Sequence, residues 1–162
     1  MAGWLCTLIL GGACVGPFSR GPNLSYDEAH DRLLELVEGG LRAGMNGDGE
    51  LPGEPVDWDA ICTDSNLAPT GDVYPTYRYH FPLERLGPNP EPFVDRVADY
   101  WQSEGLELDP NNDMEGITGM FATSRDGFSL QTFVNRGTGM ALVAGSGPCV
   151  DKAPPGFEEE IQ

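Results

Sequence analysis

The chain has 162 residues, a length typical of one domain. Its 26 Asp and Glu residues outnumber the 9 Lys and Arg residues and give a formal net charge of −17. This charge excludes nucleic acid as a partner, because phosphate binding needs a basic surface, and it excludes adhesion to anionic lipid by charge alone. Hydrophobic residues make up 40% of the chain, which is enough to form a folded core.

The N-terminal sequence MAGWLCTLILGGACVG is typical of a bacterial lipoprotein signal peptide. An apolar run, Trp4 to Leu10, is followed by small residues and then by Cys14. In such a signal the apolar run enters the membrane, the small residues fit the peptidase, and the cysteine thiol receives a diacylglycerol. We therefore predict a signal peptide over residues 1–13 and a lipid anchor on Cys14.

Two features depart from the usual signal. No Lys or Arg precedes the apolar run, and Gly11 occupies the place where a lipobox usually has Leu. A start codon further upstream would explain the first departure. The alternatives are an export signal without lipid and a buried strand or short helix of a cytosolic protein. The run is too short for a transmembrane helix, which needs about 20 apolar residues.

The rest of the chain divides into a tether, one domain and a tail. Residues 14–24 combine the lipidated cysteine with a Gly- and Pro-rich stretch, and nine flexible residues would span roughly 15–18 Å. Residues 25–150 form the predicted single domain. Residues 151–162 contain three consecutive glutamates, a pattern that favours a solvated acidic tail.

The domain begins with a predicted helix over residues 25–44. Ser25 and Glu28 have the spacing of a capping box, and apolar residues recur at helical spacing behind them. Residues 45–70 show little periodicity and many turn formers. A second helix is predicted over 89–103, with Asn89 as its cap.

Residues 73–83 alternate as a half-buried strand does. Tyr77, Tyr79 and Phe81 lie on one face, and Thr76, Arg78 and His80 lie on the other. Three further strands are predicted as a meander over 117–124, 128–135 and 140–145. The sequence thus predicts an α+β fold in which two helices pack on one face of a four-stranded, mainly antiparallel sheet, in the order α-β-α-β-β-β.

Cleavage at Cys14 would leave Cys62 and Cys149 as the remaining cysteines. A pair of cysteines in an exported chain favours a disulfide. The alternative is two buried free thiols, which would fit a cytosolic protein.

Asp109, Asn111 and Asp113 have the alternating oxygen ligands that begin a calcium loop. Such a loop also needs Gly at its sixth position and Glu at its twelfth, and these positions hold Met114 and Met120. A turn with solvated carboxylates is therefore the favoured interpretation. We predict no metal and no cofactor, with these three residues as metal candidates only.

Two further groups of residues are candidate sites. His30 and His80 are the two histidines, and no Ser or Cys nucleophile motif accompanies either one. Tyr77, Tyr79 and Phe81 crowd one strand. Core packing is the simpler interpretation of these aromatic residues, and an exposed groove for a ligand or glycan is the functional one.

Three short motifs resemble those of small actinobacterial envelope lipoproteins, including the LppA-like group of mycobacterial proteins. They are LILGGAC at residues 8–14, Trp-Asp-Ala-Ile-Cys at 58–62 and Gly-Pro-Cys-Val at 147–150. The resemblance implies a lipid anchor on Cys14 and a bridge between Cys62 and Cys149. It implies no established activity.

Together these features predict a lipid-anchored binding or accessory protein on the extracytoplasmic face of the cell membrane. Its partner would be an envelope protein or a small ligand, and catalysis is not expected. Two alternatives remain. One is an exported hydrolase-like enzyme with a calcium- or histidine-dependent site, and the other is a soluble cytosolic interaction domain.

Overall fold

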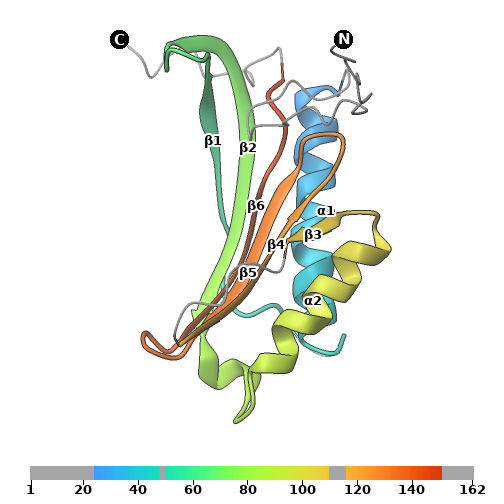
Figure 1. The fold of residues 1–162 in the computed structure, drawn as a ribbon, viewed down its shortest axis with the longest axis vertical. Helices are drawn as coiled ribbons and strands as arrows, with labels where there is room; N and C mark the ends of the chain where they lie inside the picture. Colours follow the sequence, from blue (N-terminus) through green and yellow to red (C-terminus); the bar gives the residue numbers. More distant parts are fainter. Residues whose placement is uncertain (1–23, 48–49, 110–115, 151–162) are drawn as a thin grey trace, which may run out of the picture.

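A computed structural model describes residues 24–47, 50–109 and 116–150. Two helices cover one face of a six-stranded antiparallel sheet, whose strand order is β1-β2-β6-β5-β4-β3 (Figure 1). The elements in chain order are α1 (Tyr26–Gly44), β1 (Val56–Thr63), β2 (Pro69–Pro82), the 3₁₀ turn η1 (Leu83–Leu86), α2 (Glu91–Ser103), β3 (Glu107–Asp109), β4 (Ile117–Thr123), β5 (Ser129–Asn135) and β6 (Met140–Ser146).

The predicted four-stranded sheet is wrong, because β1 and β3 add a strand at each edge. The four predicted strands correspond to β2, β4, β5 and β6, whose sequences alternate between polar and apolar residues or are bounded by strong turn signals. β1 contains Asp57 and Asp59, and Asp is depleted in strands. For this reason the sequence of the segment does not predict a strand. β3 is only three residues long and follows α2 after a short turn. The observed order is α-β-β-α-β-β-β-β.

α1 begins as predicted. Ser25 is the N-cap, its hydroxyl accepts a hydrogen bond from the Glu28 amide, and the Glu28 carboxylate accepts one from the Ser25 amide at 2.8 Å. These two bonds satisfy amides that the first helical turn leaves without partners. The predicted cap of the second helix is wrong. α2 begins after Pro90, and no side chain caps it.

The two helices approach each other closely along the glycines of α1. A methyl group added at Gly40 would lie 2.8 Å from the Trp101 indole nitrogen, and one at Gly44 would lie 2.5 Å from the Phe93 ring. The indole N–H of Trp101 donates a 2.9 Å hydrogen bond to the backbone carbonyl of Leu36. The absence of a Cβ at these glycines therefore lets large α2 side chains reach the backbone of α1.

The core lies between the helices and the sheet. The side chains of β2 that face α1 belong to it, as do the alternate residues of β5 and β6, such as Leu130 and Val143. None of the helices in the described part of the chain lies on the opposite face of the sheet (Figure 1). This second face is called the open face below.

Candidate functional site

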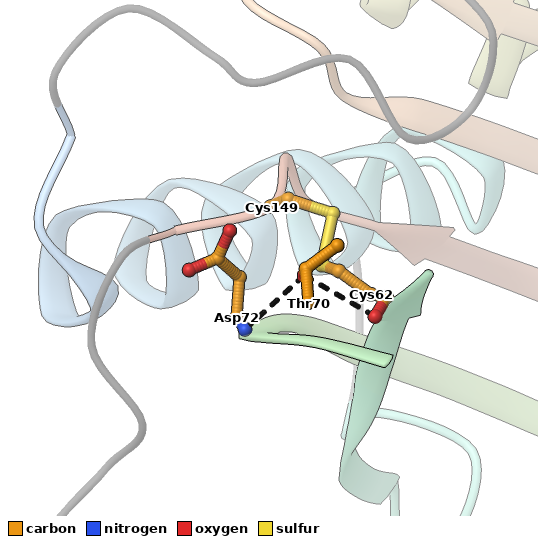
Figure 2. Close-up of a disulfide and its surroundings, with 4 residues drawn as sticks. All are labelled: Cys62, Thr70, Asp72 and Cys149. Carbon is orange, nitrogen blue, oxygen red and sulfur yellow. Dashed lines mark hydrogen bonds between the residues drawn. A yellow bond between two sulfur atoms is a disulfide. The ribbon is translucent and has the colours of Figure 1, made fainter. Parts of the chain in front are cut away.

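Cys62 and Cys149 form a disulfide, which confirms the predicted pairing. The Cα atoms are 6.2 Å apart, within the usual separation of about 4.4–6.8 Å for bridged cysteines. Both cysteines are buried. In Figure 2 the hydroxyl of Thr70 donates to the Cys62 carbonyl at 3.3 Å and accepts from the Asp72 amide. The bridge ties the end of β1 to the segment that follows β6.

The strand register aligns the open-face side chains in rows across the sheet. Directly paired residues of antiparallel strands point to the same face. The first row, called the hydroxyl row, crosses five strands: Trp58, Thr76, Ser146, Ser129 and Thr123. The second row, called the arginine row, runs beside it: Val56, Arg78, Ala144, Gln131 and Phe121.

A groove of about 390 Å³ lies over these two rows. Its centre holds small side chains, including Ala144, which is 6% exposed, and Ser146. Larger aromatic side chains stand at the two sides: Trp58 from β1 and Phe121 from β4, each 39% exposed. The volume falls at the lower end of the range typical of small-molecule sites.

Arg78 is the cation of this groove. Its guanidinium carbon lies 5.0 Å from the centre of the Trp58 ring, a cation–π arrangement. Among the described residues no carboxylate forms a salt bridge with Arg78, so the ring is its defined contact. Beside it, the buried hydroxyl of Thr76 has no hydrogen-bond partner in the described part of the chain.

Acidic side chains are kept away from the groove by the alternation of β1. Asp57 and Asp59 flank Trp58 but point to the helix side, where His30 Nε2 lies 2.9 Å from Asp57 and the Tyr26 hydroxyl donates to Asp59. Burial, followed by the hydrogen bond to Asp59, raises the pKa of Tyr26 above its usual value. In the two rows, carboxylates appear only at β3, beyond Phe121 and Thr123.

The aromatic residues proposed as a ligand groove lie elsewhere. Tyr77, Tyr79 and Phe81 are 5%, 3% and 2% exposed and form part of the core under α1. The hydroxyls of Tyr77 and Tyr79 donate to Glu38 of α1 at 3.1 and 3.3 Å. Burial is the main cause that raises the pKa of Tyr77. The three side chains hold α1 on the sheet, and the structure gives them no exposed groove.

The metal and histidine candidates are not brought together. Asp109 ends β3, and Asn111 and Asp113 lie outside the described residues. Within the described ranges no three His, Cys, Asp or Glu side chains gather closely enough to hold a metal ion. His30 is on α1, whereas His80 is on the open face of β2, so the sheet separates them. Cys14 also lies outside the described residues.

Sequence reasoning did not identify Trp58, Thr76, Arg78 and Phe121 as members of one site. The alternation of residues 73–83 did place Thr76 and Arg78 on a common face. The missing information was the strand β1 beside them and the register that puts Trp58 opposite Thr76.

Comparison with known proteins gives a fold but no family. No protein-family model matches the chain, and no curated protein matches it. A crystal structure of a DUF4853 family protein from Actinomyces odontolyticus is similar, with a TM-score of 0.51 and 12% sequence identity over 86% of this chain and 77% of that one. The likeness shows a shared fold. None of the described helices is both long and apolar enough to cross a bilayer.

Proposed function

We propose that this chain is an extracytoplasmic binding protein, held at the membrane by a lipid on Cys14, whose ligand site is the groove of the open face. The observation that carries the location is the Cys62–Cys149 disulfide. Disulfides persist in oxidising compartments and are rare in the cytosol, where thiols are kept reduced. The apolar run that ends in small residues and Cys14 supplies a matching export signal.

The groove supports binding as the role. A helix layer covers one face of the sheet, and the other face keeps two exposed aromatic rings and an arginine at a groove of about 390 Å³. Exposed aromatic side chains cost free energy in water, which a bound ligand recovers by covering them. The proposed envelope location is consistent with the resemblance of LILGGAC, residues 8–14, to the signal peptides of small actinobacterial envelope lipoproteins.

Intact mass spectrometry of the membrane-fraction protein, with and without reductant, tests the proposal. The expected mass is that of a chain beginning at Cys14 with diacylglyceryl and acyl groups, and alkylation after reduction adds two labels. Cys14→Ser abolishes acylation and releases or strands the protein, because stable anchoring takes more than one acyl chain.

Cys6→Ser is the matched control, since Cys6 lies in the same apolar stretch and would be removed with the signal peptide. It should leave the mature mass unchanged. A Cys14→Ser protein that fractionates with membrane as fully as the wild type, or a wild type without acyl mass, would overturn the anchor.

A further inference from the structure

We propose that the groove binds a saccharide that carries a carboxylate. The inference deepens the proposed binding function and rests on it. Three properties of the groove define the ligand: a row of hydroxyls at its base, aromatic rings at its sides, and a single arginine beside the hydroxyls.

The base of the groove favours a ligand with hydroxyls of its own. Thr76, Ser146 and Ser129 come from three adjacent strands, so these three residues follow one another at about 4.8 Å, the spacing of neighbouring strands. Each hydroxyl both donates and accepts, and Gln131 adds an amide in the next row. A wholly apolar ligand would cover the hydroxyls of Ser146 and Ser129 without giving them partners and would leave the buried Thr76 hydroxyl unpaired, so it is disfavoured.

The sides of the groove favour a ring with an apolar face. Trp58 and Phe121 stand at opposite ends of adjacent rows, on β1 and β4, and both remain partly exposed. Aromatic surfaces of this kind pack against flat, weakly polar groups. A pyranose ring presents C–H groups on its faces and hydroxyls around its edge, so one ring can contact one aromatic side and the neighbouring part of the hydroxyl row. Trp58 and Phe121 are four strand spacings of about 4.8 Å apart, so they would contact different parts of the ligand. The groove has room for one or two such rings.

Arg78 adds the requirement for a carboxylate. Its guanidinium has five N–H donors in a planar fork that suits a bidentate carboxylate, and it lies at the groove 5.0 Å from the centre of the Trp58 ring. The chain has a net charge of −17, yet neither row carries Asp or Glu on the five strands from β1 to β4. Exposed charges farther than about 8 Å are largely screened at physiological salt, so a direct contact with Arg78 is felt more strongly than the distant carboxylates of the chain.

Calorimetric titration of the full chain tests the ligand class. The probes are methyl β-D-glucuronide, methyl β-D-glucoside, which lacks only the carboxylate, and benzoate, which has a ring and a carboxylate but no hydroxyls. We expect the glucuronide to bind at least tenfold more tightly than either of the others, with an affinity that falls as salt rises. Equal binding of the glucoside or of benzoate would overturn the carboxylate or the saccharide requirement, respectively.

Substitutions locate the site. Arg78→Met keeps an apolar stem but removes the charge, and it should lower glucuronide affinity at least tenfold while leaving glucoside affinity unchanged. Arg85→Met, on the exposed turn η1, makes the same change of charge away from the groove and should have no such effect. Equal effects of the two variants would overturn the role of Arg78.

Trp58→Ala should weaken both sugars. Far-ultraviolet circular dichroism and the urea midpoint check that each variant is folded. If benzoate binds and its binding depends on Trp58, but the glucuronide does not bind, the saccharide is rejected as the ligand. The groove would still have a binding function. Failure of all three probes would reject the inference, whereas the mass of the membrane-fraction protein reports the lipid anchor independently.

Discussion

Replacement of Cys62 and Cys149 by alanine should destabilise the protein by about 2–5 kcal/mol. The bridge joins residues 87 positions apart, and in the chain-entropy model a loop of this length removes about 4–5 kcal/mol of conformational freedom from the unfolded state. Removing a native disulfide from a small domain costs about 2–5 kcal/mol in practice, because unfolded chains keep some structure. Both cysteines are buried, so the alanine variants also lose packing contacts around the bridge.

Urea unfolding of the oxidised wild type, the two single variants and the double variant provides the assay. Each single variant breaks the same bond, so we expect three similar losses of stability, far from additive. Wild type treated with reductant should behave like the variants. The mass of the wild type verifies that its disulfide is formed. Variants that are then less stable than the wild type by under about 1 kcal/mol would refute the argument, because effects of that size are ordinary for surface substitutions.

Four other outcomes follow from contacts that the helices make. Ser25→Ala should cost about 1 kcal/mol in a urea titration at neutral pH, because it removes the hydroxyl half of the cap. Hydrogen bonds from Ser25 lower the pKa of Glu28. The stability that this cap contributes is therefore present above pH 4.5 and is lost as the pH falls below 4.5, so the urea midpoint should fall in acid. Gly44→Ala should destabilise the protein by about 1–2 kcal/mol, since the clash with Phe93 exceeds the helix propensity gained, and unchanged or higher stability would contradict the packing. Burial raises the pKa of Tyr77, so its contribution is complete below pH 10 and falls at higher pH as the unfolded state ionises; tyrosinate absorbance should then rise together with unfolding.

The helices and the inner strands were predictable because local sequence and tertiary packing agree there. The capping box at Ser25 begins α1 as expected, and the alternation of residues 73–83 corresponds to most of β2. Glycine inside a helix is destabilising in local terms, so the local sequence does not explain the glycines of α1. Gly40 lies inside the helix and allows close contact with Trp101, and this role depends on a partner helix that the local sequence does not specify.

The edge strands were not predictable by the same reasoning. β1 is exposed along most of its length, so burial on one face does not impose an apolar alternation on its sequence. Its aspartates are satisfied by groups of α1 that precede it in the chain, namely His30 and Tyr26. Its identity as a strand therefore depends on contacts with the helix layer and on pairing with β2.

The location of the site depends on which of two chemically distinct faces the helices cover. In β2, sequence alternation separates an aromatic face with Tyr77 and Tyr79 from a mixed face with Thr76 and Arg78. The aromatic face was the more conspicuous candidate for ligand contact, but it has the larger apolar area, so burying it under α1 yields the larger hydrophobic gain. The mixed face stays exposed to solvent, and its function depends on the residues that the strand register places beside it on adjacent strands. Arg78 acquires an aromatic contact only because β1 places Trp58 beside it, so the charge and ring that define the groove come from two strands and appear together only in the folded sheet.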